Sequence, residues 1–454
     1  MRTFTLYSTP KATKTGQERV TLFSYSARIN SLRATIEEAI ARGISLSGVD
    51  LLDEKVDGLT LNDADLVSSR LEGLIANGSD FIRSNFSGAN LKKVWMEFCQ
   101  MECANFTNAR MSKSNLWGTR AVGANFSMIG ADGARFVRGV FDGANFYLAI
   151  LNNANMNLAS FKLARFEKAS LQGANLEDAD LSGACMVEAD LRESVVSRAK
   201  FDATDLTSAN CRKVDFRLAD IVSATFVGAQ LQHATFNGCT LSSLNFTSAN
   251  LDNANFVGTN FEQANLAHVQ GFRVDFTDAN FARSSLRGSK FRKTIFSKCN
   301  LSGANLSDAV WSDCVVRDAD FTGVQWAGSR FKNIKFENCQ FGGSGLEGVG
   351  FDNCTGYDTL LNSGDKLNSG ESEQALAGAV SSVVASSLTA QVIGQAKLLG
   401  ADASNALDAS AVVAVVAAVP AALEPADATA AEDRSVEQTA CEKILVDSRN
   451  HFAL

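Results

Sequence analysis

Residues 172–186 read QGANLEDADLSGACM, and the same five-residue pattern runs without an insertion from Leu61 to Phe351. An apolar residue occupies nearly every fifth position of this range. Of these 59 positions, 25 are Phe and 19 are Leu. The repeated residue is therefore large as well as apolar. The residue two places earlier is small in most units, as at Ala174 and Ala179. The repeating unit is therefore A-(N/D)-(L/F)-x-x.

A period of five matches neither an α-helix nor a long flat strand, so the chain must turn at a fixed interval. Within a unit, an extended backbone points residues two apart to the same side, which places the small residue and the Leu or Phe on one inner face. The other three positions face water and are rich in Asn, Asp, Ser, Thr and Gly, which suit tight turns. A chain that steps and turns with one inward face is a solenoid.

The chain resembles the pentapeptide-repeat family in stretches such as SGANLKK (87–93), GANFSM (123–128), NNANMN (152–157) and SGANLSDAV (302–310). The resemblance covers about two-thirds of the chain and implies an all-β fold, a right-handed four-sided β-helix solenoid with four pentapeptides per coil. Phe216, Phe236 and Phe256 lie at intervals of twenty, which would stack their rings in ladders along one wall. Extended back to Leu46, the register gives roughly 15 coils and a rod of about 70 Å.

Three domains are predicted: an N-terminal segment and cap at 1–45, the pentapeptide-repeat β-helix at 46–356, and a low-complexity, partly helical tail at 357–454. Residues 1–18 are polar and are expected to be disordered. Residues 20–27 alternate like a strand, and residues 31–42 form an amphipathic pattern that predicts a helix. This short α/β cap is expected to cover the first coil.

The tail after Tyr357 is rich in Ala, and Glu371–Leu399 has an apolar stripe that predicts an amphipathic helix. The apolar run Ala411–Val419 is too short to span a membrane. In gyrase-inhibiting members of the family a helical C-terminal segment mediates dimerisation, so the resemblance raises the possibility of a homodimer formed through this tail.

Gly271 is the one position of the series that lacks a side chain to bury. Phe272 follows it directly, beside the expected inward position. The sequence therefore predicts a local bulge or bend at this point.

Several motifs that could suggest chemistry are explained by the repeat. Six cysteines occupy the small inward position and Cys211 the large one, so they are interpreted as core residues. His233 and His268 fall at outward turn positions, and Gly343–Gly348 matches GxGxxG only at turn positions. We therefore predict no enzyme activity, no catalytic residue, no cofactor and no metal site. The first 25 residues lack a sustained apolar core, which predicts a cytoplasmic location. The six inward cysteines are Cys99, Cys239, Cys299, Cys314, Cys339 and Cys354.

The distribution of charged side chains helps to distinguish between the possible functions. Residues 46–350 contain 33 acidic and 30 basic side chains, so the rod is nearly neutral. Sorted by wall in the four-sided arrangement, the outward positions around Leu71, Leu91 and every twentieth residue to Phe351 carry 14 bases and 7 acids. We call this the basic wall. It includes Lys92, Lys93, Arg110, Lys113, Arg212, Lys213, Lys290, Arg292, Lys293, Arg330 and Lys332.

A second candidate surface is aromatic. Trp95, Phe98 and Trp117 lie at outward positions of one wall in early coils, together with Ile75. Our favoured interpretation is that the N-terminal segment packs on them, and the alternative is a partner site.

The leading hypothesis is a non-enzymatic binding scaffold of bacterial or phage type that presents the β-helix surface to a protein partner. Nucleic acid is a less favoured partner, because aromatic residues rarely interleave the basic positions. One alternative is a DNA-mimic protein that binds a topoisomerase (gyrase), which the resemblance suggests but the nearly neutral rod disfavours. Another is a secreted effector delivered into a host cell, suggested by the polar stretch Thr3–Gly16.

Overall fold

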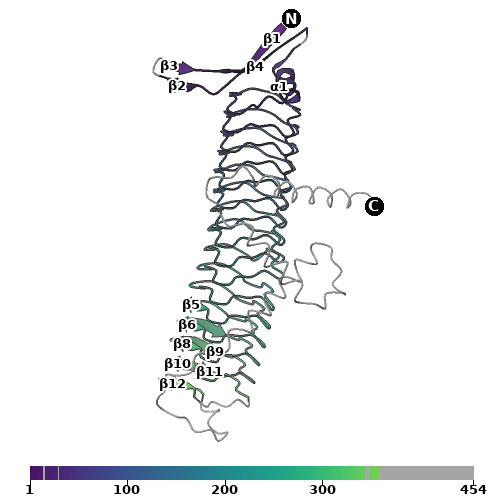
Figure 1. Ribbon diagram of the computed structural model, residues 1–454. Coiled ribbons are helices and arrows are strands. Elements are labelled where there is room, and N and C mark those ends of the chain that lie inside the picture. Colours follow the sequence, from purple (N-terminus) through teal and green to yellow (C-terminus); the bar gives the residue numbers. More distant parts are fainter. Residues whose placement is uncertain (14–15, 29, 343–347, 358–454) are drawn as a thin grey trace, which may run out of the picture. The chain divides into compact units, whose positions relative to one another are not determined.

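The computed structural model describes residues 1–13, 16–28, 30–342 and 348–357 (Figure 1). The helix predicted at Glu371–Leu399, the dimer through the tail and most of the GxGxxG match lie outside the described residues.

Coils of a β-solenoid are joined by parallel pairing between residues twenty apart. The series of bridges begins with the pair Asp50–Arg70 and ends with Lys335–Thr355. In each step two backbone bonds form, as where Phe126 N donates to Asn145 O at 2.7 Å and Asn145 N donates to Ala124 O at 3.0 Å. One coil therefore contains four pentapeptides, and the fold is mostly β. The right-handed, four-sided cross-section stays a prediction.

In the last coils the pairing widens from isolated bridges to three-residue strands (Figure 1). A five-stranded parallel sheet has the order β12-β10-β8-β6-β5, and a three-stranded one has the order β11-β9-β7. The strands are β5 (Gln270–Phe272), β6 (Lys290–Arg292), β7 (Ile295–Ser297), β8 (Val310–Ser312), β9 (Val315–Arg317), β10 (Arg330–Lys332), β11 (Lys335–Glu337) and β12 (Gly350–Asp352).

The core is a column of large apolar side chains inside the coils. The predicted ladder of Phe216, Phe236 and Phe256 is confirmed, because adjacent rings stack with their centroids 4.6 and 4.9 Å apart. In a second series adjacent rings are 4.8 or 4.9 Å apart and within 6° of parallel. The small residues of the units fill the space beside them and are likewise buried. The second series consists of Phe86, Phe106, Phe126, Phe146 and Phe166.

The turns between units use the polar outward residues. The Asn125 side chain accepts a hydrogen bond from Ser127 N at 3.0 Å, and Asp205 and Asp275 do the same for residues 207 and 277. Such bonds hold the backbone of a tight turn, as predicted for the Asn and Asp residues. The fifth residue of most units has a positive φ, for example 63° at Gly133, where a residue without a Cβ is favoured.

The N-terminal segment differs from the expectation of disorder for residues 1–18. β1 (Arg2–Tyr7) pairs antiparallel with β4 (Thr21–Ala27), and the short strands β2 (Lys11–Thr13) and β3 (Gly16–Glu18) pair with each other. The prediction of disorder was wrong because Thr and Ser hydroxyls line facing positions of β1 and β4 and bond across the pair, as Thr5 and Ser24 do at 2.9 Å.

The helix α1 (Leu32–Ala41) agrees with the helix predicted at 31–42. Ser31 caps it by accepting a bond from Ala34 N at 3.1 Å. Ile36 and Ala39 on its inner face are completely buried in the core cluster that continues into the first coil. Tyr7 O also accepts from Asp50 N, at 2.9 Å. The segment therefore covers the first coil, as the sequence predicted.

The bulge predicted at Gly271 is absent, and this prediction was wrong. Gly271 keeps its place in β5 and pairs in register with Phe291. A Cβ at this position would lie 2.6 Å from the Val274 side chain and 2.8 Å from the Phe291 ring, so its neighbours already fill the inward space.

The irregularity lies instead at residues 195–222. The bridges between residues 195 and 215 and between residues 220 and 240 are missing from the series within the described coils. Arg198 N donates to Leu218 O, a residue twenty away, whereas the preceding coil pairs Asp178 N with Ser197 O, nineteen away. Leu218, at an outward turn position in this region, is 67% exposed.

Replacing Gly271 with alanine is expected to destabilise the protein by about 1–3 kcal/mol, because the added methyl group overpacks a filled core. Gly130→Ala is the matched control, because a Cβ there meets nothing within 4 Å, and its effect should stay within about 1 kcal/mol. Urea unfolding followed by circular dichroism measures both. Equal effects of the two substitutions would contradict the packing described for Gly271.

Candidate partner-binding surface

The register fixes which outward side chains share a wall, because each residue lies beside the residue twenty positions further on. Arg110 pairs with Asn90, and Arg330 on β10 lies two strands from Lys290 on β6. The eleven bases predicted for the basic wall therefore do fall on one strip of the solenoid. They do not form one continuous surface, however, but separate into two end clusters and a middle section.

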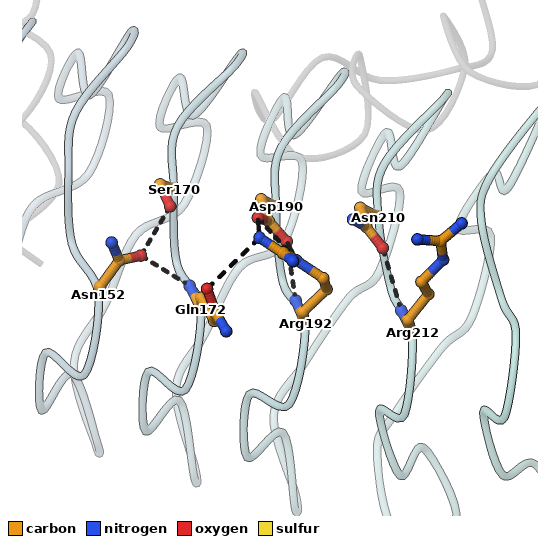
Figure 2. Close-up of polar contacts among 7 residues, drawn as sticks. All are labelled: Asn152, Ser170, Gln172, Asp190, Arg192, Asn210 and Arg212. Carbon is orange, nitrogen blue, oxygen red and sulfur yellow. Dashed lines mark hydrogen bonds and ion pairs between the residues drawn. The ribbon is translucent and has the colours of Figure 1, made fainter.

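The middle of the basic wall is a neutral polar network (Figure 2). Asn152 accepts from Ser170 Oγ at 2.6 Å, and Arg192 binds Asp190 at 2.6 Å. The two bases predicted here already have partners. Lys213 Nζ forms an ion pair with Glu193 at 2.7 Å, and Arg212 donates a hydrogen bond to Gln232. The hydrogen bond from Lys213 holds the pKa of Glu193 below its usual value. This section therefore offers little free charge to a partner.

The C-terminal cluster comprises Lys290, Arg292, Lys293, Arg330 and Lys332. Lys332 is neutralised by Asp352 at 3.0 Å, and this hydrogen bond raises the pKa of Lys332. The remaining four bases make no ion pair with any described residue.

Sequence reasoning missed an aromatic component of this cluster. The guanidinium groups of Arg292 and Arg273 lie over the Phe272 ring, 4.8 and 4.9 Å from its centroid. Phe272 is held in turn by its backbone N–H, which donates to Asp252 at 2.7 Å. The signal was present in the sequence, because Phe272 and Arg292 are twenty residues apart. Stacking restricts both guanidinium groups, so less freedom is lost when they bind an anion.

The N-terminal cluster comprises Lys92, Lys93, Arg110 and Lys113. Lys93 lies 3.9 Å from Glu72, whereas the other three make no ion pair with a described residue. Lys93, Arg110 and Lys113 are exposed to solvent, and Lys92 is half-buried.

The aromatic patch lies beside this cluster. Trp95 is 46% and Phe98 55% exposed, and Trp117 is half-buried. Phe98 and Trp117 meet edge to face with centroids 4.5 Å apart. The interpretation that the N-terminal segment packs on these residues was wrong, because its contacts are with the first coil and leave Trp95 and Phe98 open.

Other titratable groups are used for packing. Burial raises the pKa of the Cys99 and Cys314 thiols to about 12, and each thiol donates a hydrogen bond to a backbone carbonyl. Cys339 and Cys354 are only half-buried, but both pack against the core cluster, in agreement with their inward position. His233 and His268 are exposed. Within the described ranges no group of three His, Cys, Asp or Glu side chains is placed to hold a metal ion.

Two family models match the chain. The model of pentapeptide repeats (8 copies) matches residues 61–97, 96–127, 159–198, 197–238 and 229–267, and that of the pentapeptide repeat region matches residues 273–351. The chain belongs to the pentapeptide repeat family. No curated protein matches it.

This pentapeptide repeat protein is similar to several solved structures. One is a pentapeptide repeat protein from the Arabidopsis thaliana thylakoid lumen, with 27% identity over 20% of this chain and a TM-score of 0.20; the match spans 63% of that protein. Another is HetL from the cyanobacterium Nostoc sp., involved in heterocyst differentiation regulation, with 20% identity, coverage of 67% and 93%, and a TM-score of 0.14. A third is full-length QnrB1, a plasmid-mediated fluoroquinolone resistance protein, with 17% identity, coverage of 59% and 96%, and a TM-score of 0.14.

The buried thiols should resist alkylation. At pH 8 a thiol with a pKa of about 12 is almost entirely protonated, so Cys99 and Cys314 should react with iodoacetamide at least about a hundredfold more slowly in the folded protein than in urea. Mass spectrometry of the two tryptic peptides measures the rates. Similar rates with and without urea would show that these cysteines are not held in the core.

Proposed function

We propose that this protein is a non-enzymatic, cytoplasmic binding scaffold whose basic wall docks an acidic surface of a protein partner. The right-handed, four-sided cross-section implied by the family is part of the proposal, since it would present the basic wall as a flat face. The observation that carries the proposal is the uneven neutralisation of the surface bases.

Most bases elsewhere on the coils are neutralised by neighbouring acids. Arg83 lies 2.7 Å from Asp63, and the same distance separates Arg198 from Asp178 and Arg217 from Asp215. In the end clusters of the basic wall, by contrast, most bases face solvent without such a partner. Unneutralised charges of one sign raise the local potential, which steers and orients a partner of the opposite sign.

The outward carboxylates and amides support a scaffold rather than a catalyst. Many of them accept a bond from the backbone two residues later, as Asn245 does from Thr247 N at 3.0 Å. A side chain held in this way maintains the turn that the coil needs, and it is a poor candidate for proton transfer to a substrate.

The two alternative functions gain less support. A topoisomerase-binding DNA mimic requires a surface rich in free carboxylates, whereas the unpaired charges of the basic wall are mostly cations. The effector hypothesis relied on an unstructured Thr3–Gly16, but β2 and most of β1 lie within this stretch. Both functions stay predictions, and a gyrase supercoiling assay and a translocation reporter fused to residues 1–45 test them.

Reversing the charge of Lys290, Arg292 and Lys293 together to Glu should weaken partner binding about tenfold or more, because the attraction becomes repulsion. The measurement is a quantitative pull-down from native host extract with the full-length protein. The matched control is Lys298→Glu/Arg317→Glu/Lys335→Glu, which changes the same charge in the same part of the solenoid but on the β7, β9 and β11 side.

Partners that depend on the basic wall should be lost from the first variant and retained by the control. Circular dichroism should show both variants folded. Retention of every partner by the first variant would overturn the proposal.

A further inference from the structure

Three aromatic side chains lie on the same wall in two successive coils. Trp95 bridges Asn115 of the next coil, and Phe98 N donates to Trp117 O at 2.9 Å, so backbone pairing fixes their relative positions. Phe98 and Trp117 touch edge to face, and Trp95 and Phe98 each expose about half of their surface. Large aromatic residues held together at a surface mark an interaction site more often than isolated apolar residues do.

The fold does not require an aromatic residue at position 98. Phe98 has a φ of 55°, a left-handed conformation in which Gly or Asn is preferred. The next coil has Gly118 at the equivalent position, and a Cβ there would lie 2.9 Å from the Phe98 ring. The ring therefore lies against bare backbone. Its contribution is to the surface and not to the core.

Cations lie beside the patch, on the preceding wall and in the next coil of the same wall. Across the segments 90–98, 110–118 and 130–138, the outward positions carry six bases and two acids. One of the acids, Glu97, accepts a hydrogen bond from Asn115 Nδ2 at 2.6 Å. The other, Asp132, is exposed. The six bases are Lys92, Lys93, Arg110, Lys113, Arg135 and Arg138.

We propose that this aromatic and basic surface is a second docking site, which holds the protein on an anionic lipid bilayer. Trp95, Phe98 and Trp117 enter the boundary between the headgroups and the acyl chains, and the flanking bases contact the anionic headgroups. Trp and Phe beside Lys and Arg form the combination that interfacial membrane contacts use. The site is distinct from the C-terminal cluster tested above.

The arrangement of the rings favours lipid over single-stranded nucleic acid. Proteins that bind single strands offer separate aromatic faces on which successive bases stack, set along a line of positive charge. Here Phe98 covers Gly118 and meets Trp117 edge to face, so these two rings form one continuous apolar area. The bases lie beside this area instead of alternating with the rings.

Tryptophan fluorescence gives a direct measurement. The chain has four Trp residues, and Trp311 and Trp326 are fully buried in the core, so a spectral change on binding reports Trp95 and Trp117. Full-length protein is titrated with vesicles of phosphatidylcholine alone or with about one quarter phosphatidylserine. The expected result is a blue shift and co-sedimentation with the anionic vesicles, and much weaker binding to the neutral ones.

Variants separate the two parts of the surface. Trp95→Ser/Phe98→Ser should lower partitioning onto anionic vesicles at least tenfold, and each of Lys93→Gln and Lys113→Gln should lower it about fivefold. The control Met128→Ser/Leu148→Ser removes side chains that are 45% and 40% exposed elsewhere and should bind normally.

Absence of binding to anionic vesicles, or equal loss in the control variant, would overturn the proposal. Binding of a thymidine oligonucleotide that Trp95→Ser/Phe98→Ser abolishes, without vesicle binding, would assign the surface to nucleic acid and also overturn it.

Discussion

The parallel backbone pairing between successive coils supports every other feature of this protein. A single pentapeptide makes few bonds within itself, and most of its N–H and C=O groups are satisfied by the units about twenty residues before and after it. The pairing sets a constant spacing between coils, and that spacing is what lets Phe rings stack at 4.8 or 4.9 Å along the interior. Stability is thus spread along the chain as contacts between neighbours.

The same pairing arranges the surface. A residue and the one twenty positions later become neighbours, so columns of outward side chains run along the solenoid. Polar residues within one column form hydrogen bonds with each other, as Ser170 does with Asn152, and these columns are neutral stretches of the surface (Figure 2). Charge remains available only where a column lacks the complementary residue in the adjacent coil. In such a fold a binding surface therefore forms where the outward residues depart from the regular pattern, while the backbone of the coils beneath stays the same.

Much of the fold followed from the sequence because the repeat is local and regular. The inward positions, the aromatic ladders, the turn roles of Asn and Asp and the helix at 31–42 were all predicted and are all observed. The failures are equally specific. Gly271 was expected to distort the coil, yet the side chains of Val274 and Phe291 fill its place. The real irregularity, near Leu218, occurs where the apolar register is intact and gave no warning.

The period of five by itself determined the family of the fold and which side chains face inward, because both depend only on the local alternation of the backbone. Tertiary structure alone decided which surface charges are neutralised and which apolar side chains are covered. Many of those outcomes depend on residues 18 to 21 positions away, such as Asn115 on Glu97 or Glu177 on Arg198, and on where the N-terminal segment packs. The sequence could place the bases and the aromatic residues on their walls, but only the stacked coils show which of them remain available to a partner.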